Sequence, residues 1–257
     1  MNLLDRARKA LRAGRKAVLP EPEVRAPSDQ AAWEDAVALW NALFAPFSPV
    51  LENADVVEVG CGDGRLLGAL MATGGIRSAV GVERRAWWDG EGGGPAWRPR
   101  DTAGLDLRVG LDAVGGLDEG AADLILAREL DGFLPLDGLE TWLTDLYGLL
   151  RPGGELMVRV RCGDGSGEPE APGYGFMTPT AWTALMLGAG FEILDRRRTW
   201  RRSTEQSAAA DRLPHASEDE RLTAELHLHL IRPWESWELD DLRAFGDQRR
   251  TGKPQKT

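Results

Sequence analysis

The residues best able to do chemistry lie in one short stretch, Glu58-Val59-Gly60-Cys61-Gly62-Asp63-Gly64, where three glycines alternate behind a carboxylate. Glycine permits positive φ angles and lets a ligand approach the backbone closely. A helix predicted just beyond the last glycine would offer unpaired N–H groups to a polar ligand. A carboxylate beside the turn repels pyrophosphate and attracts a cation or an ammonium group. The stretch therefore predicts a turn that binds a positively charged cofactor.

The spacing of the glycines argues against two commoner nucleotide sites. A dinucleotide fingerprint, G-x-G-x-x-G, counted from Gly60 places Arg65 where the third glycine belongs. A P-loop needs lysine followed by serine or threonine after its glycines, and this turn has neither. The turn is therefore not expected to cradle phosphates.

A second carboxylate follows at the end of the next apolar run. Glu83 closes the sequence Ser78-Ala79-Val80-Gly81-Val82, which predicts a short strand. An acid at this point of a nucleotide-binding fold can accept two hydrogen bonds from a ribose diol. Glu83 is therefore a candidate ribose ligand.

The pattern Glu-x-Gly-x-Gly-x-Gly resembles motif I of the class I S-adenosylmethionine-dependent methyltransferases. Leu149-Leu150-Arg151-Pro152-Gly153-Gly154 ahead of an apolar run resembles a second point in that family, where proline ends a helix and glycine makes a turn. The resemblance covers about residues 51–232. It implies an α/β fold with a Rossmann-like, mainly parallel seven-stranded sheet, flanking helices and an antiparallel last strand. It also implies methyl transfer from S-adenosyl-L-methionine.

The same resemblance implies a set of cofactor-binding residues. Asp112 and the small residue after it match the family's step that contacts the adenine edge. Arg128 directly follows the fourth predicted strand, where it is expected to help hold the cofactor or an acidic substrate. The full expected set is Glu58, Gly60, Cys61, Gly62, Gly64, Glu83, Asp112, Ala113 and Arg128.

The acceptor and the catalytic base are not fixed by the sequence. The Asn/Asp-Pro-Pro-Tyr/Phe motif of enzymes that methylate DNA bases or glutamine is missing after Arg128, which favours an unidentified small-molecule acceptor. The candidate bases are Glu129, Asp131, Tyr174 and His215, and no feature favours one of them. Two alternatives remain open, a non-catalytic partner subunit with this fold and an RNA-directed methyltransferase.

Composition bounds the partners and the compartment. A net charge of -10 and a pI near 4.9 oppose a general nucleic-acid binder. The one dense basic run, Arg196–Arg202 around Trp200, could bind RNA or pair with the chain's own acids.

Two cysteines cannot build a disulfide framework, so the reducing cytoplasm is expected. No apolar run is long enough to span a membrane. His227 and His229 lack a third ligand nearby, so no metal is expected.

Hydrophobic patterns predict the elements that position these residues. Strands are expected at 56–59, 78–83, 105–109, 122–127, 155–160, from 191 and at 222–231. Helices are expected at 31–44, 66–73, 139–150 and from Pro179. We therefore divide the chain into an N-terminal helical extension and candidate lid (1–50), the cofactor-binding domain (51–232), and a C-terminal helix with a charged tail (233–257). The oligomeric state is left open.

Overall fold

The structure is a computed structural model of the 257-residue chain. It describes residues 27–47, 49, 51–72, 75–83, 104–110, 112–128, 138–162, 177–200, 218 and 223–235. None of the helices in this described part combines the length and the apolar composition that a membrane span requires. Residues 1–26 and 236–257, which hold most of the expected N-terminal extension and the C-terminal tail, lie outside this described part.

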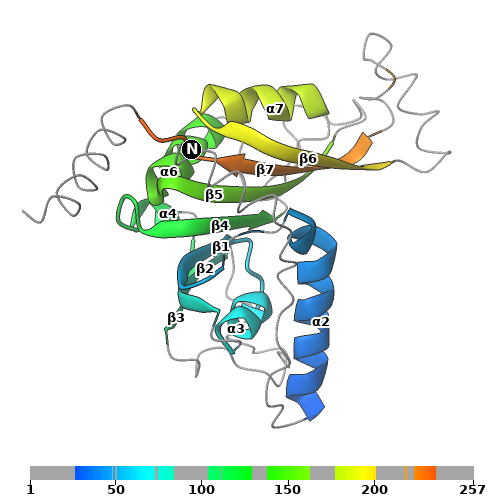
Figure 1. Ribbon diagram of the computed structural model, residues 1–257, viewed down its shortest axis with the longest axis vertical. Coiled ribbons are helices and arrows are strands. Elements are labelled where there is room, and N and C mark those ends of the chain that lie inside the picture. The colour runs from blue at the N-terminus through cyan, green and yellow to red at the C-terminus, as the bar shows by residue number, and fades with distance from the viewer. Residues whose placement is uncertain are drawn as a thin grey trace, which may run out of the picture.

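The centre of the fold is a seven-stranded sheet with the order β3-β2-β1-β4-β5-β7-β6 (Figure 1). All neighbouring strands are parallel except β7, which runs antiparallel to both β5 and β6. The strands are β1 (Ala54–Val59), β2 (Ile76–Glu83), β3 (Leu105–Val109), β4 (Ala122–Arg128), β5 (Leu150–Arg161), β6 (Glu192–Trp200) and β7 (Thr223–Ile231). The predicted sheet and its antiparallel last strand are therefore confirmed.

Helices cover both faces of this sheet (Figure 1). One face packs against α2, α3 and the short 3-10 helix η1, and the other packs against α4, α6 and α7. Their bounds are α2 (Pro27–Leu43), η1 (Ala45–Phe47), α3 (Arg65–Ala72), α4 (Asp112–Gly115), α6 (Leu139–Leu149) and α7 (Pro179–Gly188). The last four residues of β1, 56–59, are all buried. This is expected of a central parallel strand that has a helical layer on each face.

The segment before β1 is part of the core. Trp40 and Phe44 are fully buried against the sheet face that also holds Leu66 and Leu70 of α3. Burying each such side chain contributes about 2 to 3 kcal/mol. Helix α2 therefore packs as a structural element, and its proposed second role as a lid stays a prediction.

The predicted start of α7 is confirmed in detail. Thr178 accepts a hydrogen bond from the Ala181 N–H at 3.2 Å, and Pro179 occupies the first helical position. Trp182 on the same helix is fully buried, and its indole N–H donates to the carbonyl of Arg161 at 3.1 Å. This hydrogen bond ties α7 to the end of β5.

The Arg-Pro-Gly-Gly stretch differs from its prediction as a separate turn. Strand β5 begins at Leu150, directly after α6, so residues 151–154 lie inside the strand and form a bulge in its pairing with β4. Gly153 has φ +80°, which explains the need for glycine there. Arg151 forms ion pairs with Asp55 of β1 at 2.7 Å and with Asp123 of β4 at 2.5 Å. The stretch therefore joins three strands at the edge opposite the binding turn.

Candidate functional site

The glycine turn links β1 to α3 as predicted. Gly60, Gly62 and Gly64 all have positive φ angles, of 74°, 61° and 76°. The Gly60 N–H donates to the carbonyl of Val82 at 2.9 Å, which fixes the turn to the end of β2. The Gly64 N–H donates to the carbonyl of Cys61 at 3.0 Å and closes the turn ahead of α3. This conformation requires glycine, because L-residues rarely adopt it.

Two of these glycines meet very different surroundings. A Cβ at Gly60 would lie 2.8 Å from the carbonyl oxygen of Arg128, so glycine there allows β1 to pack against β4. A Cβ at Gly62 would meet nothing within 4 Å among the described residues. Gly62 therefore leaves open space over the turn, which a ligand lying close to the backbone requires.

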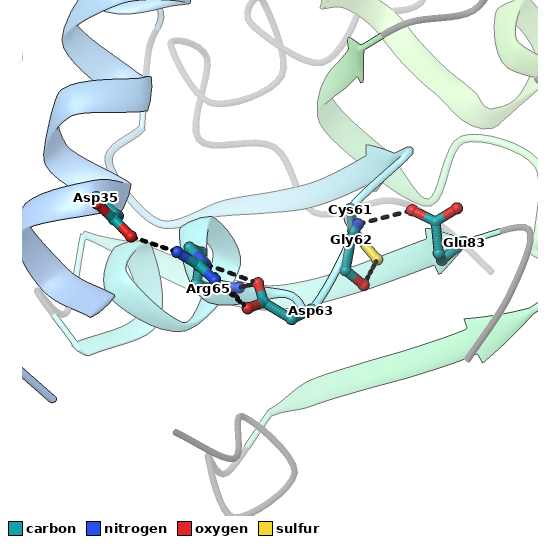
Figure 2. Close-up of polar contacts among 6 residues, drawn as sticks. All are labelled: Asp35, Cys61, Gly62, Asp63, Arg65 and Glu83. Carbon is teal, nitrogen blue, oxygen red and sulfur yellow. Dashed lines mark hydrogen bonds and ion pairs between the residues drawn. The ribbon is translucent and has the colours of Figure 1, made fainter. Parts of the chain in front are cut away.

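Glu83 lies beside this open turn. Its Oε2 atom accepts a hydrogen bond from the Gly62 N–H at 2.7 Å (Figure 2). The Glu83 side chain is mostly buried. This bond fixes the carboxylate at the carboxyl end of β2. A carboxylate offers about four acceptor sites, and the bond from the Gly62 N–H occupies one of them.

The other side of the turn is tied to helix α2. Asp63 accepts hydrogen bonds from the Arg65 backbone N–H at 3.1 Å and from its guanidinium at 3.0 and 2.9 Å (Figure 2). Arg65 also forms an ion pair with Asp35 of α2 at 2.5 Å. Asp63 and Arg65 therefore stabilise the start of α3, and their charges are used within the protein.

Glu58 is found against Arg128. An Nη2 atom of Arg128 lies 2.7 Å from Glu58 Oε1 and donates to the Gly60 carbonyl at 3.0 Å. Glu58 is 0% exposed, and neither of its oxygens accepts a well-aligned hydrogen bond from the described residues. Burial raises the pKa of Glu58 from 4.5 to about 7, and the attraction of Arg128 offsets this only in part.

This pairing changes the interpretation of both residues. The sequence predicted that Glu58 attracts the positive charge of a ligand, and the structure shows Arg128 supplying a positive charge to it. The ion pair and the bond to Gly60 place Arg128 directly beside the turn. Contact of either residue with a cofactor stays a prediction.

The remaining predicted residues lie at the same edge or outside the described part. Asp112 and Ala113 begin α4 shortly after β3, and the structure describes only their backbone. The Cys61 thiol is buried, and burial raises its pKa far above the usual range, so it is no nucleophile. The four candidate bases, Glu129, Asp131, Tyr174 and His215, lie outside the described residues.

The structure adds Arg159 to the charged residues that the sequence singled out. Strand register places Arg128, Arg159, His227 and Arg197 side by side on four neighbouring strands. From the sequence, His227 was considered only as a metal ligand, and the described residues hold no group of metal-binding side chains. Glu225 instead lies 3.4 Å from the His227 ring. The position of Arg159 near the end of the fifth predicted strand was the signal that could have identified it.

The basic run predicted as one patch is divided by β6. Arg196 pairs with Leu228, whereas Arg197 pairs with His227, so neighbouring arginines face opposite sides of the sheet. Arg198 shares the face of Arg196. Arg201 and Arg202, the last two arginines of the run, lie beyond the described residues. Its described part therefore does not form one continuous basic surface.

No family model and no curated protein sequence matches this chain. Many solved structures match its fold. An S-adenosylmethionine-dependent methyltransferase from Mesorhizobium loti is 16% identical, with 77% of this chain and 99% of that chain covered and a TM-score of 0.54. The geranyl diphosphate C-methyltransferase from Streptomyces coelicolor A3(2), solved with S-adenosyl-L-homocysteine, is 16% identical, with coverage of 84% and 87% and a TM-score of 0.54.

A third similar structure catalyses another reaction. The [4+2]-cyclase SpnF is 18% identical, with 91% of this chain and 93% of that chain covered and a TM-score of 0.54. Likeness at this level of identity concerns the fold, because one fold hosts many functions. The strand order, the antiparallel β7 and these similar structures agree with one another. The chain therefore has the fold of the class I S-adenosylmethionine-dependent methyltransferases.

Proposed function

We propose that this protein is an S-adenosylmethionine-dependent methyltransferase (EC 2.1.1.-) that acts on a small molecule. The observation that carries the proposal is the open turn at Gly62 with the Glu83 carboxylate bonded to it, at the carboxyl end of β1 in this fold. Ligands of open α/β sheets bind at this edge, beside the reversal of strand order between β1 and β4.

The residues present fit this cofactor. The open space over Gly62 admits a nucleoside near the backbone, and Glu83 suits its ribose hydroxyls. Asp112 and Ala113 would lie at the adenine edge, and the turn residues Gly60, Cys61 and Gly64 would line the cofactor. The carboxylate of Glu58 and the guanidinium of Arg128 would lie toward the methionine part of the cofactor, which carries an ammonium and a carboxylate group.

When bound, the cofactor supplies a methyl group on a sulfonium, and an acceptor lone pair forms the new bond as the carbon–sulfur bond breaks and its electron pair goes to sulfur. The chain's part is to hold the acceptor in line with that bond and to exclude water. An acceptor that carries a proton must also lose it to a base or to solvent. The described residues next to the turn offer arginines and buried acids, and we assign the base to none of them.

The first test is calorimetry with S-adenosyl-L-methionine and S-adenosyl-L-homocysteine. Glu83→Gln should weaken binding about tenfold or more, because hydrogen bonds to a charged group contribute about 1.5 to 3 kcal/mol. The matched control is Glu52→Gln, an exposed acid ahead of β1 at the opposite edge, which should bind normally. Equal affinity in both variants would contradict the ribose assignment.

A second experiment separates transfer from binding alone. We would incubate the protein with methyl-labelled cofactor and a small-molecule extract, and follow the label. Label in a new small molecule supports the transferase. Tight cofactor binding without any labelled product would favour the non-catalytic partner subunit, and label in RNA would favour the RNA-directed alternative.

We place the protein in the cytoplasm, since both of its cysteines are free thiols.

A further inference from the structure

Four basic side chains form one row across the sheet beside the binding turn. Arg128 of β4 pairs with Arg159 of β5, Arg159 pairs with His227 of β7, and His227 pairs with Arg197 of β6. Residues paired across neighbouring strands point to the same face. We call Arg128, Arg159, His227 and Arg197 the cation row.

The cation row begins at the cofactor turn and leads away from it. Arg128, at its first position, donates to the Gly60 carbonyl at 3.0 Å. Neighbouring strands lie about 4.8 Å apart, so the row extends roughly 14 Å from Arg128 to Arg197. Its far end rests on η1, where Arg197 donates to the Pro46 carbonyl at 2.7 Å and lies over the Phe47 ring at 5.2 Å. This length suits a small molecule placed beside a cofactor.

Carboxylates offset part of the row's charge. Glu58 pairs with Arg128, Glu225 pairs with Arg159, and Asp195 lies 3.7 Å from Arg197. Burial lowers the pKa of His227, and Arg159 and Arg197 lower it further, whereas Glu225 raises it. Arg161 lies two residues after Arg159 on β5 and therefore adds an exposed cation on the same face.

The arrangement is unusual for this chain. Like charges opposite each other on neighbouring strands destabilise a sheet. The protein as a whole carries a net charge of -10, yet three arginines and a histidine meet here. The side chains of Arg128, Arg159 and Arg197 are 18%, 25% and 51% exposed, so a ligand at this edge can reach them. Guanidinium groups bind carboxylates and phosphates through paired hydrogen bonds.

We propose that the methyl acceptor is an anion whose carboxylate or phosphate binds Arg159 and Arg197, with its nucleophile over the end of β4. This inference rests on the proposed function, because it names the substrate class of the same site. His227, between the two arginines, lies beside the bound anion and reports on it.

The test uses inorganic phosphate as the probe, with S-adenosyl-L-homocysteine present at saturation. The imidazole signals of His227 are followed by NMR while phosphate or chloride is added at matched ionic strength. Phosphate at the row should raise the pKa of His227, because a nearby anion favours the charged imidazole. Arg159→Gln combined with Arg197→Gln should weaken phosphate binding about tenfold or more.

The matched control removes the same charge from the opposite face of β6. Arg196→Gln combined with Arg198→Gln should leave the response of His227 to phosphate unchanged. Since loss of Arg159 leaves Glu225 without that partner, Arg197→Gln alone, at a half-exposed position, serves as the variant that keeps the fold. It should weaken phosphate binding with an unchanged circular dichroism spectrum.

The outcomes separate this inference from the proposed function. If the homocysteine nucleoside binds but phosphate shifts His227 no more than chloride does, the anionic acceptor is refuted alone. The same holds if both double variants lose phosphate binding equally. If phosphate binds but the nucleoside does not, the acceptor role falls together with the proposed function.

Discussion

Replacing Glu58 by glutamine should stabilise the ligand-free protein above neutral pH. Glu58 is fully buried, and neither of its oxygens accepts a well-aligned hydrogen bond within the described part of the chain. Its ion pair with Arg128 therefore offsets only part of the cost of burying a charge. Glutamine has nearly the same shape and carries no charge to desolvate.

The magnitude follows from the pKa of Glu58, which burial raises from 4.5 in the unfolded chain to about 7 in the folded protein. Between these values the folded state holds a proton that the unfolded state has lost, so stability falls as pH rises through this window. At about 1.4 kcal/mol per pKa unit, the full loss is about 3 kcal/mol. Between pH 5 and pH 8 the wild-type protein should lose about 2 to 3 kcal/mol that Glu58→Gln retains.

Urea unfolding followed by tryptophan fluorescence at pH 5, 6, 7 and 8 measures this difference. The two proteins should have similar stability at pH 5, and Glu58→Gln should be the more stable one at pH 8. Glu155→Gln is the control, because Glu155 is a buried acid with a good partner, His229 at 3.0 Å, and its replacement should destabilise. A pH-independent difference between wild type and Glu58→Gln would refute the reasoning.

Three further predictions concern the turn and the scaffold. Gly62→Arg should abolish cofactor binding measured by calorimetry, whereas Gly120→Arg, at the similar φ of 64° and away from the site, should have the same strain of about 1 to 2 kcal/mol and bind normally. Asp55→Asn should destabilise by about 1 to 3 kcal/mol at pH 7. Hydrogen bonding from Arg77 holds the pKa of Asp55 well below its usual range, so this difference should shrink as urea unfolding is repeated below about pH 4. Trp182→Phe should lower the free energy of unfolding by about 1 to 3 kcal/mol in the same assay and leave cofactor affinity unchanged. The reason is that the substitution removes the indole N–H that donates to the Arg161 carbonyl of β5.

Local chemistry made the fold and the turn predictable. The glycines of the turn, the acid ending β2 and the Thr178-Pro179 start of α7 each depend on neighbours close in sequence, and the structure places them as predicted. The bulge at Gly153 was missed, because the same Pro-Gly-Gly letters suit a turn or an irregular strand.

The charges of the site could not be paired from the sequence. Arg128 meets Glu58 only because β4 lies beside β1, and this neighbourhood comes from strand order. The cation row depends on the register of four strands, and a shift by one residue would turn each side chain to the other face. Sequence patterns place residues on strands, whereas register is a property of the packed sheet.

We expect Glu58 to lower the stability of the ligand-free protein above neutral pH. An acid that lowers the stability of the ligand-free protein is consistent with a role in ligand binding, because functional sites often carry strain or unfavourable charge. The cation row also places like charges opposite each other on neighbouring strands, and the carboxylates of Glu58, Glu225 and Asp195 offset only part of that cost. Both features lie at the carboxyl edge of the central strands.

The most direct test of the central claim is a crystal structure of the protein soaked with S-adenosyl-L-homocysteine. We expect density for the nucleoside over Gly62, with both ribose hydroxyls hydrogen-bonded to Glu83. Density for the nucleoside at another place, or none at millimolar concentration in crystals that keep this fold, would contradict it.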